Sequence, residues 1–160
     1  MKTYTIADFD YNWSDFTISH FSDWLNDEYD LNIKLIPQPL PPKIFGAWLK
    51  HRSQNYLFYA TDISPFHQAH AILHEMGHLL SGHATYEITD QDLHDYANGE
   101  FELFAFARKR STADATAEEI EAEMFAIQVQ ERVIAHQEYL SMGTPSGEPH
   151  REFLSALGLI

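Results

Sequence analysis

The chain has 160 residues, which is the usual length of one domain and short for two. Hydrophobic residues make up 44% and aromatic residues 14%, so the chain can bury a core, and this excludes the disordered and low-complexity classes. A net charge of −14 argues against direct binding of nucleic acid, and the absence of cysteine excludes disulfides, thiolate metal sites and cysteine nucleophiles.

The sequence shows neither a secretory signal nor a membrane span. Residues 1–8 lack the apolar run of a signal peptide. No apolar stretch approaches the roughly 18 residues that a membrane-spanning helix needs. We therefore expect a cytoplasmic protein that forms one domain over residues 1–160, with a short tail over about residues 142–160.

A helix and a short strand are predicted near the start of the chain. Apolar side chains recur at helical spacing over about residues 15–29, and these are Ile18, Phe21, Leu25 and Tyr29. A strand is expected over residues 32–36, where apolar and polar side chains alternate. We expect this strand to stop at Pro37, since proline has no N–H to donate.

A β-hairpin is predicted next. Residues 46–51 and 56–60 are rich in aromatic and β-favouring side chains, and the polar residues 52–55 between them predict a four-residue turn. The second strand leads directly into the next predicted helix. Strand 56–60 is therefore either an open edge, to which an extended peptide can add, or an inner strand of the sheet.

Three helices are predicted in the remaining chain. Ser64 is a typical N-cap residue and is followed by proline, while Gly82 is a typical stop, so a helix is expected over about residues 65–81. Two further helices are expected over residues 90–97 and about 117–141. Together with the strands, these helices predict an α+β fold.

His74, Glu75 and His78 form the sequence H-E-x-x-H inside the helix predicted over residues 65–81. Residues four apart lie on the same face of a helix, so the two imidazoles can bind one Zn²⁺ from a single rigid segment. Glu75 projects beside them, where it can act as a general base toward a water. A solvated polar face is the competing interpretation, but such faces usually carry Lys, Glu and Arg.

A zinc site of this kind needs a third protein ligand. The continuous pattern that adds Gly and His seven and ten residues after the first histidine does not fit, because the chain has Ser81 and Ala84 there. A glutamate of the 117–141 helix is the alternative. Glu119 is the first choice because it borders the small apolar stripe of that helix, and Glu118 and Glu121 are the remaining candidates.

Glu119 also has a structural interpretation. Thr116 and Glu119 match a capping box, in which the carboxylate accepts a backbone N–H at the start of the helix. Beside His74 and His78 we favour the ligand role. Glu123 lies one turn further on, where it can accept a hydrogen bond from a ligand imidazole.

The segments 64–83 and 119–126, which carry these motifs, resemble the ImmA/IrrE family of metallopeptidases. That family pairs an HExGH helix with a downstream ExEAxxFA helix, and the resemblance covers about residues 20–135. It implies a zincin-like α+β fold. In such a fold a small sheet and hairpin pack on the active-site helix, and a second helix carries the third ligand.

The resemblance also implies functional roles. It implies zinc held by His74, His78 and Glu119, with Glu75 as the catalytic base. More loosely, it implies cleavage of a repressor or another regulator, for example a helix-turn-helix repressor. Glu123 departs from the family pattern, because many members carry Asp or Asn at this position.

Three functions are weighed. The leading one is a zinc-dependent endopeptidase that cleaves a regulatory protein, with Zn²⁺ as the cofactor and a protein as the substrate. The first alternative is a non-catalytic zinc module that binds and inactivates a transcriptional regulator. The second is an acidic partner protein such as a DNA mimic, which the net charge of −14 suggests.

Three more residues near the motif carry expectations. His70 is expected to be a hydrogen-bonding or surface histidine rather than a ligand. His83 is expected to cap the C-terminus of the 65–81 helix rather than line the cleft. Gly77 costs about 1 kcal/mol relative to alanine in a helix interior, so we expect another element to pack closely over it.

Overall fold

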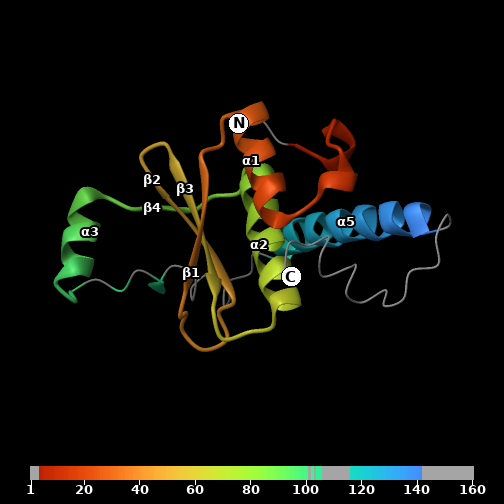
Figure 1. Ribbon diagram of the computed structural model, residues 1–160. Helices are drawn as coiled ribbons and strands as arrows, with labels where there is room; N and C mark the ends of the chain where they lie inside the picture. Colours follow the sequence, from red (N-terminus) through yellow and green to blue (C-terminus); the bar gives the residue numbers. More distant parts are fainter. Residues whose placement is uncertain (1–3, 101, 103, 106–115, 142–160) are drawn as a thin grey trace.

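The computed structural model describes residues 4–100, 102, 104–105 and 116–141, and the predicted tail over about 142–160 lies outside them. Helices and strands alternate irregularly along the chain, and one sheet is formed (Figure 1). In order, the elements are two 3₁₀ turns (Ile6–Asp8 and Trp13–Asp15), α1 (Ile18–Tyr29), β1 (Ile33–Gln38), β2 (Gly46–His51), β3 (Gln54–Ala60), α2 (Pro65–Leu80), β4 (Tyr86–Glu87), α3 (Asp90–Ala97) and α5 (Thr116–Ser141). The expected mixture of α and β structure is confirmed.

The sheet has the strand order β1-β3-β2-β4. Strands β1 and β3 are parallel, β2 and β3 are antiparallel, and β4 runs parallel to β2. Strand β3 is therefore an inner strand, and the interpretation of residues 56–60 as an open edge is wrong. The reason is a non-local contact, because the backbone N–H of Asn55 donates to Asn32 and its side chain donates to the carbonyl of Leu31, which holds β1 against β3.

Two strand boundaries differ from the sequence prediction. Strand β1 continues through Pro37 instead of stopping there, which an edge strand tolerates because one side of it needs no ladder donor. The hairpin turn has two residues instead of four. Arg52 adopts a left-handed conformation with φ of 54°, and this lets His51 pair directly with Gln54.

The helix predictions agree better with the structure. The first helix begins at Ile18, three residues later than expected, because the hydroxyl of Thr17 caps it. Helix α2 has the predicted N-cap, where Ser64 accepts from the N–H of His67, and Gly82 follows its end with φ of 73°. Helices α3 and α5 also lie where the sequence places them.

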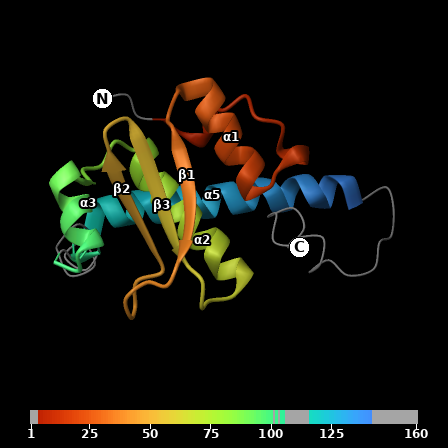
Figure 2. The ribbon, with the colours of Figure 1, turned by 60° about the vertical axis from the view of Figure 1, so that its left-hand side comes forward.

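Helix α2 lies between the sheet and α5, so its two sides face two different neighbours (Figure 2). The main core joins buried side chains of α1, the sheet, α2 and α5. Its fully buried members include Phe21, Leu57, Leu73, Met76 and Val129. This packing leaves one face of α2 for the histidines and holds them between the sheet and α5.

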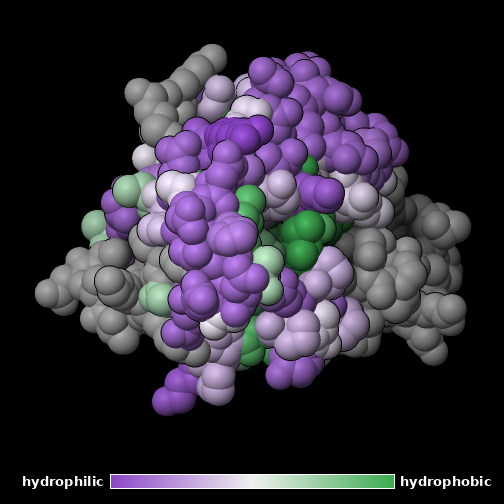
Figure 3. Space-filling view, turned by 90° about the vertical axis from the view of Figure 1, so that its left-hand side faces the viewer, coloured by the Kyte–Doolittle hydropathy of each residue, from purple (hydrophilic) through white to green (hydrophobic). Residues whose placement is uncertain are grey.

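The opposite face of the sheet carries a second, smaller core. Its buried side chains are Ala47, Leu49, Phe58, Ile88 and Phe104. A cavity of about 220 Å³ lies between this core and α3. Figure 3 looks onto this side of the molecule, where hydrophobic surface is visible beside a hydrophilic band. Within the described ranges, no helix is long and apolar enough to cross a membrane.

Candidate metal centre

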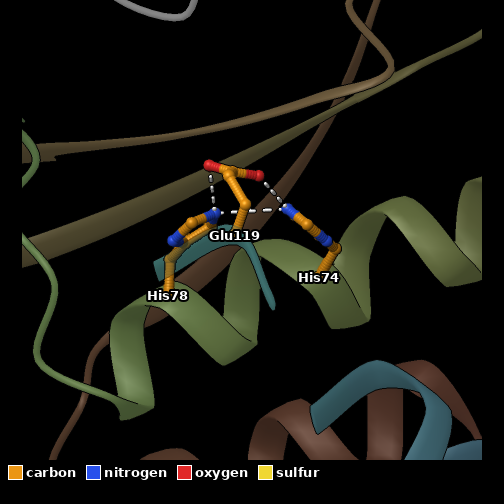
Figure 4. A group of neighbouring side chains, drawn as sticks. All are labelled: His74, His78 and Glu119. Atoms are coloured by element: carbon orange, nitrogen blue, oxygen red, sulfur yellow. Dashed lines mark hydrogen bonds and ion pairs between the residues drawn. The ribbon is translucent and has the colours of Figure 1, made fainter. Parts of the chain in front are cut away.

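Helices α2 and α5 bring His74, His78 and Glu119 together (Figure 4). The Nε2 atom of His74 lies 3.0 Å from Oε2 of Glu119 and 3.2 Å from Nε2 of His78. The Nε2 atom of His78 lies 3.2 Å from Oε1 of Glu119. These three side chains form a group that can hold a metal ion.

The spacing of the donor nitrogens and oxygens fits a tetrahedral ion. Ligand atoms at about 2.0–2.2 Å from a tetrahedral Zn²⁺ lie roughly 3.3 Å apart. This is close to the 3.2 Å between the two Nε2 atoms and to the 3.0 and 3.2 Å from each Nε2 atom to its own oxygen of Glu119. The Oε1 atom of Glu119 is buried and accepts no hydrogen bond from any residue that the structure describes, and its 3.2 Å contact with Nε2 of His78 is an ion pair only when that imidazole is protonated. A buried carboxylate oxygen that faces a neutral imidazole nitrogen without a hydrogen between them is unfavourable, and a cation among the three side chains would remove that cost.

The carboxylate of Glu119 points toward the histidines of α2, and not back along α5 as a capping box would require. Of the two other candidates, Glu121 contacts His83 instead. Glu118 is not part of the group that can hold an ion. Glu119 is thus the carboxylate that the structure brings to His74 and His78.

The close approach of α5 to α2 depends on small residues. Gly77 faces the backbone of Ala122, and a Cβ at Gly77 would overlap it. Ala122 and Ala126 are fully buried at this crossing. The expectation that another element packs closely over Gly77 is therefore confirmed.

Glu123 and His70 form a second layer behind the group. The Oε2 atom of Glu123 lies 3.0 Å from Nδ1 of His74, and its Oε1 atom lies 3.0 Å from Nε2 of His70. Gln130 contacts the other nitrogen of His70. Partial burial raises the pKa of Glu123, but the hydrogen bonds from His74 and His70 outweigh it and hold the pKa below its ordinary value. The expected hydrogen-bonding roles of Glu123 and His70 are confirmed.

The expectation for His83 is wrong. Its side chain does not cap α2 but is buried, with 7% exposure, and its Nδ1 atom lies 2.9 Å from Nδ1 of His78. Its Nε2 atom lies 2.8 Å from Oε2 of Glu121. The sequence signal for this contact is Gly82, whose positive φ turns the chain back so that residue 83 meets the last turn of α2.

A cavity of about 300 Å³ opens beside the group. Glu75, which is 8% exposed, lines this cavity together with His74, His78 and Glu119. The start of β2 and the residues before it form the opposite wall. Gly46 in that wall leaves room for Glu75, because a Cβ there would lie 3.1 Å from Cγ of Glu75.

Comparisons of this chain with protein-family models, with curated proteins and with solved structures found no match. The resemblance to the ImmA/IrrE family and the zincin-like fold therefore stay predictions from the motifs. The structure adds that the His–His–Glu group and the buried carboxylate of Glu75 lie at one cavity.

Proposed function

We propose that this protein is a zinc-dependent endopeptidase in which His74, His78 and Glu119 hold the ion and Glu75 is the general base. The observation that carries the proposal is the position of Glu75, which lines the same cavity as the His–His–Glu group. Two imidazoles and one carboxylate are a donor set that Zn²⁺ accepts, and three protein ligands leave a fourth position open.

The chain's own residues supply the remaining chemistry. A bound zinc ion would polarise the scissile carbonyl and lower the pKa of a water to about 7. Glu75 accepts the proton of the attacking water and returns it to the leaving amine. The Nδ1 atom of His74 is held by Glu123, so the ring presents Nε2 toward Glu119.

The edge of β2 supplies a place for an extended substrate. Within the described residues, β4 pairs with β2 only at Leu49 and Lys50, and the hydroxyl of Thr85 donates to the carbonyl of Trp48, so residues 46 and 47 are the part of this edge that the ladder does not cover. These residues also line the cavity of the His–His–Glu group. A peptide that added to this edge as a strand would pass beside Glu75. We propose that this peptide belongs to a regulatory protein such as a helix-turn-helix repressor, and this proposal is based on the resemblance of the motifs alone.

The Glu75→Gln variant tests the catalytic proposal. The zinc-loaded protein is incubated with a mixture of unstructured peptides, and cleavage is followed by mass spectrometry. We expect Glu75→Gln to bind zinc as the wild type does and to lose about 10²–10⁴-fold in rate. The matched control is Glu131→Gln, an exposed glutamate of α5 away from the cavity, which should cleave normally.

Two results would overturn the proposal. Normal cleavage by Glu75→Gln would remove Glu75 from the reaction. A wild-type protein that binds zinc but cleaves no peptide would favour the non-catalytic zinc module instead.

A further inference from the structure

The last turn of α2 and the loop after it bring two buried imidazoles into contact. His78 is 0% exposed and His83 is 7% exposed, and their Nδ1 atoms lie 2.9 Å apart. The far nitrogen of His83, Nε2, lies 2.8 Å from a carboxylate oxygen of Glu121. The three side chains thus form a chain of contacts that begins at the exposed Glu121 and ends at a member of the metal group.

When Glu121 is ionised and His83 is neutral, the hydrogen-bonding capacities of these groups fix where the protons lie. An ionised carboxylate only accepts, so Nε2 of His83 carries the hydrogen that Glu121 receives. A neutral imidazole has a single N–H, so Nδ1 of His83 is an acceptor. The facing Nδ1 of His78 must then be the donor, because two acceptors at 2.9 Å would make no bond. This leaves the lone pair of His78 on Nε2.

That lone pair lies on the side of the ring where the metal group is formed. The Nε2 atom of His78 is 3.2 Å from Oε1 of Glu119 and 3.2 Å from Nε2 of His74. The lone pair of His74 is also on Nε2, because its Nδ1 atom faces the carboxylate of Glu123 directly at 3.0 Å. Both histidines therefore present Nε2, one supported by a carboxylate and the other by an imidazole.

Helix α5 carries both carboxylates that orient the two histidines, and they lie on different sides of this helix. Glu123, which contacts His74, is one turn from Glu119 and faces α2 as Glu119 does. Glu121, which contacts His83, is about 200° around the helix from Glu119. The loop that follows α2 carries His83 to that other side. The contacts from Glu121 through His83 to His78 thus depend on the same packing of α2 against α5 that places Glu119.

We propose that His83, oriented by Glu121, is a positioning residue that holds His78 in the tautomer whose Nε2 can bind a metal ion. The inference rests on the metal site of the proposed function and adds to it a requirement on His83. A residue that only filled space at position 83 would offer no acceptor to Nδ1 of His78.

The test uses the full chain with two substitutions of His83. Asparagine can place its amide oxygen near the position of Nδ1 and accept from His78, whereas leucine fills the space without an acceptor. The tautomer of His78 in metal-free protein is read from ¹⁵N NMR, and zinc affinity is read from competition with a chelator. We expect His83→Asn to keep the Nδ1–H tautomer of His78. We expect His83→Leu to lose it and to bind zinc about 10- to 100-fold more weakly.

Glu121 provides a variant that does not disturb the core, because its side chain is 61% exposed. Glu121→Ala should weaken zinc binding and mix the tautomers of His83, and the exposed Glu131→Ala should change neither. If His83→Leu does not fold, the result for Glu121→Ala decides.

The outcomes separate this inference from the proposed function. An unchanged Nδ1–H tautomer of His78 in His83→Leu, or in Glu121→Ala an unchanged tautomer of His83 together with unchanged zinc affinity, would overturn the positioning role alone. A wild-type protein that binds no zinc would overturn the proposed function, and the NMR measurement would still decide whether His83 sets the tautomer.

Discussion

Gly77 of α2 and Ala122 of α5 are in such close contact that a Cβ on Gly77 would lie 2.7 Å from the carbonyl oxygen and 2.8 Å from the Cα of Ala122. Both of these atoms belong to backbone, which cannot move aside as a flexible side chain can. The glycine therefore sets how closely the two helices approach. Since α2 carries His74 and His78 and α5 carries Glu119, it also sets the size of the metal group.

Gly77→Ala should destabilise the protein even though alanine is the better helix former. The gain in helix propensity is about 1 kcal/mol, and overpacking a tight contact typically costs about 1–3 kcal/mol. Because the overlap is with backbone, we expect a net loss of unfolding free energy in urea, together with weaker zinc binding. A variant more stable than the wild type would show that the helices are not held at this distance.

Gly46→Ala should separate catalysis from metal binding. A Cβ at this position would lie 3.1 Å from Cγ of Glu75 and 3.3 Å from the carbonyl oxygen of Ala71, so Glu75 has to shift by a few tenths of an ångström. We expect peptide cleavage to fall by about tenfold. Zinc affinity should stay unchanged, since the nearest atoms to the added Cβ belong to none of the three proposed ligands. Equal loss of both properties would argue against this assignment of Glu75.

Glu123→Ala should weaken zinc binding although Glu123 is not a proposed ligand. Its carboxylate accepts from Nδ1 of His74 at 3.0 Å, which orients the ring and favours a free Nε2. We expect a zinc dissociation constant about 10- to 100-fold higher, measured by chelator competition. Glu131→Ala on the exposed side of the same helix is the control, and an affinity equal to that of the control would contradict the role of Glu123.

The helices were largely predictable because their start and stop signals are local. Ser64 and Gly82 bracket α2 in the sequence as they do in the structure. The two members of the H-E-x-x-H motif that share a face are likewise fixed by the helical repeat alone. The choice of the third ligand required a comparison of two distant segments. From one sequence the choice could be narrowed to a few glutamates, with Glu119 first, but it could not be fixed.

Two of the features that the sequence missed depend on non-local packing. The inner position of β3 arises from pairing with β1, where Ile33 lies opposite Asn55, and no pattern in residues 56–60 predicts this pairing. His83 joins the site because the loop after α2 meets Glu121 of a helix that begins more than thirty residues later. Patterns in a short stretch of sequence cannot predict such contacts, since the contacts depend on how whole helices and strands pack against one another.

The stability of the α3 region should depend on pH through Asp92. The backbone N–H of Thr89 is the main cause of a lowered pKa of Asp92, and the hydroxyl of Tyr86 adds to it, with both bonds at 2.9 Å. A carboxyl whose pKa is lower in the folded state stabilises the fold above its unfolded pKa of about 3.9. That stability is lost as the pH falls through the folded value.

Asp92→Asn should therefore be less stable than the wild type at neutral pH, and the gap should narrow in acid. Urea unfolding of both proteins over a pH series measures this difference. A gap that stays constant from neutral pH down into the acid range would contradict the lowered pKa.

The most direct test of the metal centre is the zinc content of the full chain, purified without added zinc and measured by mass spectrometry under native conditions. We predict one zinc ion per chain in the wild type and in Glu118→Ala, and a strongly reduced content in Glu119→Ala. A wild-type chain that carries no zinc and cannot be loaded with it, or a zinc content that is independent of Glu119, would contradict the account.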